Sequence, residues 1–185
     1  KPDAIYTSLW GGDLVSFIDQ ALLYGIFKNT ELFAINLADY TTMSAVRNLP
    51  KGLHSATRYV AAWPNTQDNR DYDKSYTDIY GDHPTNWSWE ASVGIDYLIN
   101  ALKETRSTDT KKLAEAIKGK TRKSFMGVGD GNTVSIRDRD QTIVDYSIGW
   151  GTTISNEPYM TGIQGADWNT IKELENEWLT DKGWL

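Results

Sequence analysis

The sequence contains no cysteine and only two histidines among its 185 residues. The missing cysteine excludes disulfides, thiol catalysis and zinc or iron–sulfur sites built on thiolates. No run of apolar residues approaches the ~18 that a membrane-spanning helix needs. Acidic side chains outnumber basic ones by 25 to 19, and the basic residues form no cluster. Neither nucleic acid nor an anionic membrane surface is therefore an expected partner.

The motifs of common catalytic and metal sites are absent as well. Neither His54 nor His83 belongs to a recognisable Ser–His–Asp arrangement, since the chain has no G-x-S-x-G elbow. The glycines of 127–132 spell G-x-G-x-G without the spacing and the helix of a nucleotide-binding loop, which favours a hairpin turn. The aspartates of 130–140 lack the spacing of a calcium-binding loop. We therefore predict no catalytic residue, no metal ligand and no cofactor.

What the sequence does contain, in its first third, is short apolar runs that alternate with amphipathic segments. Residues 4–9, 31–36 and 53–62 are apolar and partly β-branched, as buried strands are. Residues 13–25 and 39–48 carry apolar side chains at helical spacing. This alternation predicts an α/β fold, with a parallel sheet, flanking helices and right-handed crossovers.

The rest of the chain is predicted to be mostly helical. Apolar spacing indicates helices over 65–80, 87–102, 108–118 and 167–179. The second of these helices has a broad apolar face, so we expect it to be central and buried. Its main stripe consists of Ala91, Ile95, Leu98 and Leu102, with Trp89 and Val93 beside it. The last helix carries a narrower stripe of Trp168, Ile171, Leu174 and Trp178.

Two strands are expected between these helices, followed by a loop. The strands, at 134–136 and 142–150, flank a charged hairpin turn. Residues 155–165 are predicted to form a loop.

Aromatic residues give the strongest indication of a binding site, with eight tryptophans and ten tyrosines in the chain. Trp10, Tyr40 and Trp63 each follow a predicted strand, and ligands of open parallel sheets bind outside the carboxyl ends of the strands. We therefore predict that one wall of a crevice is lined by Ser8, Leu9, Trp10, Leu37, Asp39, Tyr40 and Trp63. Local packing is the alternative for each aromatic residue.

Two aspartates are candidates for helix N-caps. Asp13 and Asp39 each stand immediately before an apolar-periodic segment. For Asp39 the sequence leaves two hypotheses open, a contact with a cationic group of a ligand or a cap for the following helix.

Several segments together resemble type I periplasmic binding proteins, most closely the branched-chain amino acid receptors that serve ABC transporters. The resemblance covers residues 1 to about 155 and rests on the order and spacing of the segments 2–5, 10–13, 17–21, 76–81 and 136–141. It implies two α/β lobes joined by a hinge, with a ligand held between them.

The resemblance also implies that this chain is an incomplete C-terminal portion of such a fold. Residues 1–62 and 125–160 would form the second-lobe α/β domain, and 65–120 the helical part of the first lobe. Residues 161–185 would be a C-terminal helical tail. Because the chain starts without Met, we interpret it as processed or cut from a longer protein whose signal peptide is not seen here.

Such receptors are not enzymes, and the resemblance implies a small-molecule solute and membrane permease subunits as partners. It implies a periplasmic location, or a membrane-associated extracellular one in a Gram-positive source. In amino acid receptors an acidic side chain after the second-lobe strand meets the substrate ammonium. Leu37 stands at that place here, with Asp39 two residues later, so the solute is amino-acid-like, aromatic or a carboxylate.

Two other functions are alternatives to the receptor. A flavodoxin-like α/β enzyme domain with an unidentified active site is the main alternative. A tryptophan-rich carbohydrate-binding module is disfavoured by the helical stripes. If strands of a first lobe are missing, the helices of 65–120 have no sheet to pack on, and we expect them to associate with the missing N-terminal half or with a second copy.

Overall fold

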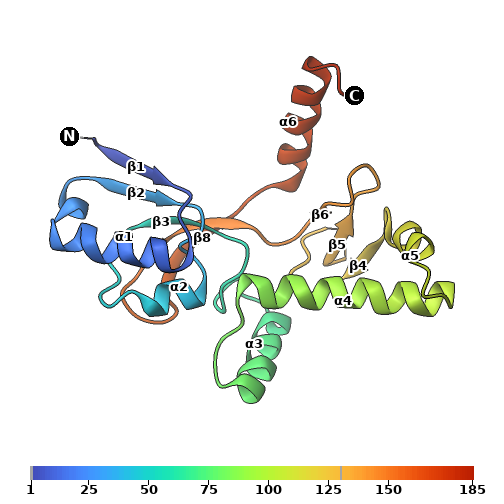
Figure 1. Cartoon of the computed structure of the whole chain (residues 1–185), viewed down its shortest axis with the longest axis horizontal. Coiled ribbons are helices and arrows are strands. Elements are labelled where there is room, and N and C mark those ends of the chain that lie inside the picture. The colour runs from blue at the N-terminus through green and yellow to red at the C-terminus, as the bar shows by residue number, and fades with distance from the viewer. Residues whose placement is uncertain (1, 130) are drawn as a thin grey trace.

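A computed structural model of the chain describes residues 2–129 and 131–185 (Figure 1). Lys1 and Asp130, the latter in the predicted turn at 127–132, lie outside the described residues. No helix in the described part is long and apolar enough to span a bilayer.

A five-stranded mixed sheet occupies one end of the molecule, with strand order β1-β2-β3-β7-β8. Strands β1 (Ala4–Thr7), β2 (Glu31–Ala34) and β3 (His54–Thr57) run parallel to one another. Strands β7 (Gly149–Thr153) and β8 (Met160–Gly165) continue the sheet in antiparallel pairing. The predicted α/β fold with a parallel sheet and flanking helices is therefore confirmed.

Helices α1 (Gly11–Leu23) and α2 (Tyr40–Ala45) connect the parallel strands and lie together on one side of this sheet (Figure 1). A short 3-10 turn, η1 (Ile26–Lys28), precedes β2. Leu14 and Ile18 of α1 are fully buried against Leu32 of β2 and form the centre of the first hydrophobic core. The apolar spacing that predicted α1 thus marks the face that the helix buries.

A second core lies between the long helix α4 (Asn86–Thr105) and a small antiparallel sheet. That sheet has the order β4-β5-β6, with strands β4 (Thr121–Lys123), β5 (Thr133–Ile136) and β6 (Ile143–Val144). Trp89 and Tyr97 of α4 are buried there, and the Tyr97 hydroxyl donates to the carbonyl of Val134 at 2.8 Å. The helices α3 (Gln67–Tyr80) and α5 (Thr110–Ile117) flank this unit.

Residues 125–160, predicted to belong to the second lobe, contribute to both cores. β5 and β6 lie in the second core with α4, whereas β7 lies in the large sheet. The division of the chain into lobes stays a prediction.

Two strand predictions are wrong. The predicted single strand at 142–150 is split into β6 and β7, because Asp145 has a left-handed φ of 62° that breaks the extended backbone between them. The predicted loop at 155–165 contains β8, an edge strand in which only Met160 is buried. An exposed edge strand has no apolar alternation, so the pattern gave no strand signal.

The predicted N-cap of the first helix is wrong, whereas the four later helices are confirmed. α1 starts at Gly11, so Asp13 lies in its first turn and Trp10 occupies the N-cap without a side-chain hydrogen bond. Asp39 is the N-cap of α2, as predicted. The helices at 65–80, 87–102, 108–118 and 167–179 are all present, with ends that differ by a few residues.

The connection between the two cores runs through residues 58–66. Tyr59 belongs to the second core and Val60 to the first, so adjacent residues anchor both. The buried amide of Asn69 on α3 donates to the carbonyls of Ala61 and Pro64, each at 3.0 Å. This fixes the path of the chain between the cores.

The apolar stripe predicted to bury α4 is exposed instead. Ile95 is 54% and Leu98 is 36% exposed, whereas Trp89, Val93 and Tyr97 are buried. The buried and the predicted stripes lie on different sides of the helix, so α4 has two apolar faces. Only one of them is covered in this chain.

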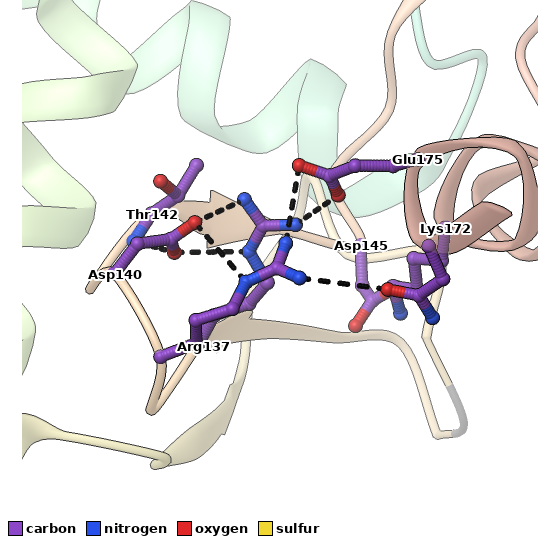
Figure 2. Close-up of polar contacts among 8 residues, drawn as sticks. Arg137, Asp140, Thr142, Asp145, Lys172 and Glu175 are labelled. Atoms are coloured by element: carbon purple, nitrogen blue, oxygen red, sulfur yellow. Dashed lines mark hydrogen bonds and ion pairs between the residues drawn. The ribbon is translucent and has the colours of Figure 1, made fainter. Parts of the chain in front are cut away.

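The C-terminal helix α6 (Trp168–Asp181) projects away from both sheets (Figure 1). Figure 2 shows Arg137 paired with two carboxylates, that of Asp140 in its own β5–β6 hairpin and that of Glu175 on α6. Lys172 of α6 pairs with Asp145, which follows β6. The predicted stripe of this helix is mostly open, with Leu174 60% and Trp178 50% exposed. These ion pairs hold the base of α6 together with Trp168, whose indole packs on the Tyr146 ring and donates to the Tyr146 carbonyl at 2.6 Å.

We predict that this attachment weakens in acid. The hydrogen bond from Arg137 lowers the pKa of the Glu175 carboxyl. A lowered folded-state pKa stabilises the attachment above the unfolded value of about 4.3, and the stabilisation is lost as pH falls through the folded value. Since Glu175 is 34% exposed, the effect is expected to stay below about 1 kcal/mol.

Backbone amide chemical shifts of α6, followed from pH 7 to pH 3, measure the loss of the attachment. Glu175→Gln should show at pH 7 the α6 shifts that the wild type reaches only in acid. Glu173→Gln, on the same helix, is the matched control and should titrate like the wild type. An α6 that titrates identically in Glu175→Gln would contradict the prediction.

Candidate functional site

An open cleft of about 570 Å³ lies where the carboxyl ends of β1, β2 and β3 face the start of α4. Its wall combines aromatic, small polar and apolar side chains with one cation and one anion. The lining residues are Trp10, Gly11, Ile35, Asn36, Asp39, Thr41, Thr42, Ala56, Thr57, Arg58, Asn86, Trp87 and Ile148.

Two exposed tryptophans belong to this wall. Trp10 follows β1 and is 66% exposed, and Trp87 stands in the first turn of α4 and is 58% exposed. Large exposed indoles in a concave site offer flat apolar surface with a polar edge. The cleft is therefore suited to a small amphiphilic molecule with a planar part.

The carboxylate of Asp39 joins the two sides of the cleft. Its Oδ1 accepts from the backbone N–H and the hydroxyl of Thr41, at 3.2 and 2.5 Å. Its Oδ2 accepts from the backbone N–H and the side-chain amide of Asn86, both at 3.1 Å. Asp39 thus caps α2 and also satisfies a first-turn N–H of α4.

These four hydrogen bonds bear on the two hypotheses for Asp39. The residue is only 7% exposed, and both of its oxygens have two donors. Little acceptor capacity is left for a cationic ligand group. The geometry supports the helix-cap hypothesis.

The only cation in the described cleft wall is Arg58, which follows β3 directly. Its Nη1 pairs with the Glu90 carboxylate of α4 at 2.8 Å, and its guanidinium lies 5.0 Å from the ring centre of Trp87. Burial raises the pKa of the Glu90 carboxyl, and the Arg58 charge opposes that rise. Arg58 therefore links the large sheet to α4, as Asp39 does.

Two buried polar atoms of lining residues have no hydrogen-bond partner within the described residues. These atoms are the hydroxyl oxygen of Thr57 and the amide oxygen of Asn86. Buried polar groups are normally paired, so atoms left unpaired beside a cleft point to a missing ligand or water.

The structure brings only part of the predicted site together. Trp10 and Asp39 line the same cleft, at the predicted edge of the sheet. Ser8 and Leu9 are exposed beside it but are outside the lining. Leu37 is fully buried in the first core.

The remaining two predicted residues lie elsewhere. Tyr40 lines a separate pocket of about 160 Å³, where it contacts His83 edge to face. Trp63 packs against the first core. Whether any of the predicted residues binds a ligand stays a prediction.

The error at Trp63 and the omission of Arg58 have one cause. The third strand was expected to run over 53–62, which put Trp63 at its carboxyl end. The observed β3 ends at Thr57, so Arg58 takes that place. Sequence reasoning also missed Asn86 and Trp87, although the capping box of Thr85 and Ser88 marks the start of α4.

No group of three or more acidic or histidine side chains in the described part of the chain is placed to hold a metal ion.

The comparisons with known proteins agree with this fold. A family model described as periplasmic binding protein matches residues 1–149. No curated protein matches the chain. Because the family model covers most of the sequence, the chain belongs to the periplasmic binding protein family.

Solved structures similar to the chain are solute-binding proteins of ABC transporters. One, from Rhodopseudomonas palustris BisB5 in complex with 3,4-dihydroxybenzoic acid, is 22% identical with a TM-score of 0.76, over 90% of this chain and 46% of its own. A second from R. palustris, in complex with benzoate, is 15% identical with a TM-score of 0.68, over 89% and 42%.

A leucine-binding protein from Thermotoga maritima is 20% identical with a TM-score of 0.63, over 90% of this chain and 44% of its own. The chain thus spans less than half the length of the structures it matches. At these identities the likeness establishes the fold, a type I periplasmic-binding-protein fold that is incomplete here.

The role of Asp39 predicts a loss of stability on substitution. Asp39→Ala should lower the free energy of unfolding by about 2–4 kcal/mol, because it removes a helix cap and leaves buried Asn86 donors unpaired. Asp39→Asn, which keeps one acceptor oxygen, should cost about half as much. Urea unfolding measures both.

Asp13→Ala is the matched control, since Asp13 lies in the first turn of α1 and caps nothing. It should change stability by less than about 1 kcal/mol. A stable Asp39→Asn variant that has lost solute binding would restore the ligand-contact hypothesis for this residue.

Proposed function

We propose that the chain is the C-terminal portion of an extracytoplasmic receptor of an ABC transporter, and that the cleft beside Trp10 and Arg58 holds its solute. The observation that carries the proposal is the position of this cleft, outside the carboxyl ends of parallel strands and closed on the other side by α4. Membership of the periplasmic binding protein family supports it.

The solute is a small amino-acid-like, aromatic or carboxylate molecule. The titles of the similar structures name 3,4-dihydroxybenzoic acid, benzoate and leucine binding. The exposed indoles of Trp10 and Trp87 and the polar groups of Thr42 and Asn86 suit such molecules. ABC permease subunits in the membrane are the protein partners of the whole receptor.

A receptor explains the cleft better than the flavodoxin-like enzyme does. In a hydrolytic or acid–base site we expect titratable groups poised to exchange protons. The acid in the described cleft wall, Asp39, has both oxygens occupied by hydrogen bonds, and the lining contains no histidine. A receptor requires no catalytic residue in this lining.

Further polypeptide covers two faces that this chain leaves open. Parallel sheets occur almost only with helices on both faces. The face opposite α1 carries Tyr6, which is 70% exposed, and the stacked rings of Phe33 and Trp150. On α4, Ile95 and Leu98 are open as well. The missing N-terminal half covers both faces in the whole receptor, and a second copy is the other candidate.

Calorimetric titration of the chain with 3,4-dihydroxybenzoate, benzoate and leucine tests the receptor function. We expect at least one of them to bind. Trp10→Ala should weaken that binding about 2- to 10-fold, the value of an aromatic contact. Trp178→Ala, at an exposed tryptophan on α6, is the matched control and should leave it unchanged. Failure of all three solutes and of a wider panel of amino acids, sugars and organic acids would contradict the proposal.

The open faces predict association. An apolar patch of a few hundred Å² contributes several kcal/mol when buried, at ~25 cal/mol per Å². Light scattering at increasing concentration should therefore detect dimers or larger species. The double variant Ile95→Lys with Leu98→Lys should shift them toward monomer, whereas Lys111→Glu on α5 should not. A wild-type chain that stays monomeric at high concentration would contradict the prediction.

A further inference from the structure

The described lining of the cleft offers no free carboxylate to an ammonium group. Asp39 is its only acidic residue among the described lining, and both carboxylate oxygens already accept two hydrogen bonds each. Leu37, which follows the same strand, is apolar and fully buried. A protonated amine placed in this cleft would lose its hydration without gaining a charged partner.

The cleft does offer a cation with donors to spare. A guanidinium carries five N–H groups in a planar fork, and Arg58 uses Nη1 for Glu90. That geometry leaves the other edge of the fork for a second carboxylate, which arginine binds in bidentate fashion. Trp87 lies against the guanidinium, so a planar solute group bound there would also contact an indole.

The start of α1 adds to the positive potential of the same cleft. Trp10 and Gly11 line it, and α1 begins there without a side-chain cap. The first-turn N–H groups of a helix carry partial positive charge and favour anions. The space beside Gly11 and Gly12 is open, because a Cβ at either position would meet no atom within 4 Å.

Two lining residues carry buried polar atoms without a partner in the described residues, the Thr57 hydroxyl, which can donate or accept, and the Asn86 amide oxygen, which accepts. Thr57 is 2% exposed, lines the cleft and precedes Arg58. A hydroxyl can donate to a carboxylate that the neighbouring guanidinium holds. Thr57 and Arg58 at the end of β3 and the start of α1 therefore supply the donors of this cleft.

We infer that the cleft selects an anion: its solute is a carboxylate attached to an apolar, planar group, with Arg58 as the carboxylate partner, and it discriminates against α-amino acids and amines. This inference rests on the proposed receptor function and narrows its three solute classes to one.

Glu90 acts as the internal counter-ion of Arg58 and sets the strength of this selection. Its carboxylate pairs with Nη1 and offsets part of the charge that would attract a solute carboxylate to the other edge of the guanidinium. Neutralising Glu90 removes this offset and the repulsion of an incoming anion. Glu90→Gln should therefore bind anions about 1.5- to 5-fold more tightly, in the range of one partly exposed ion pair.

A matched series of four probes tests the inference on the whole chain: phenylacetate, its amide, 2-phenylethylamine and L-phenylalanine. They share the ring and differ in charge. We expect phenylacetate to bind most tightly in calorimetric or NMR titration, the neutral amide more weakly, and the amine and the amino acid weakest of all.

Arg58→Gln should weaken phenylacetate binding about 10- to 150-fold, the range of a charged hydrogen bond, and leave the amide nearly unchanged. The double variant with Glu90→Gln avoids an unpaired acid and should give the same loss if Arg58→Gln alone unfolds. Arg47→Gln, at an exposed arginine outside the lining, is the control.

Each outcome bears on the inference. Equal binding of phenylacetate and its amide, tighter binding of the amine or of phenylalanine, or an Arg58→Gln variant with unchanged phenylacetate affinity would overturn it. If leucine or phenylalanine binds, but phenylacetate, benzoate and 3,4-dihydroxybenzoate do not, the receptor function stands and the anion inference fails. If no solute of any class binds, both fail.

Discussion

The hydrogen bonds of the Asp39 carboxylate are the constraint on which the cleft depends. One oxygen caps α2 behind β2, and the other holds the first turn of α4, 47 residues further along the chain. Without this bridge the large sheet and α4 would be joined near the cleft by the Arg58–Glu90 pair, whose side chains are 35% and 26% exposed. Breaking the hydrogen bonds of a buried carboxylate with four donors costs more than breaking a partly exposed ion pair. Asp39, a candidate ligand contact in the sequence, therefore holds together the wall of the cleft.

The molecule is organised as two cores that share one crossing. Tyr59 and Val60 anchor opposite cores, and Asn69 fixes the backbone just beyond them. Only one face of the large sheet and one face of α4 are covered within this chain. Figure 1 shows the two helices α1 and α2 on the covered side of the sheet. The chain spans less than half of the similar structures. The same arrangement leaves both the apolar faces and the cleft open.

The sequence predicts elements of this fold better than it predicts the site. Helices α1, α4 and α6 follow from apolar spacing because that signal is local. β8 escaped prediction because an exposed edge strand buries too little to leave a pattern. The site depends on where each strand ends. The predicted end of the third strand was a few residues too late, so Trp63 was predicted in the cleft where Arg58 lies. Asn86 lies in the cleft wall because it contacts Asp39, 47 residues earlier in the chain, and no local sequence pattern encodes such a contact. Trp10 and Asp39 were predictable because they follow well-defined strands.

The central claim is that a solute binds between the sheet edge and α4. The most direct test is a titration of the chain with phenylacetate, followed through the indole N–H resonances of its eight tryptophans. The account predicts that the resonances of Trp10 and Trp87 shift together with one affinity, while those of Trp178 and Trp184 stay in place. Shifts confined to the tryptophans outside the cleft, or none at saturating phenylacetate, would contradict it.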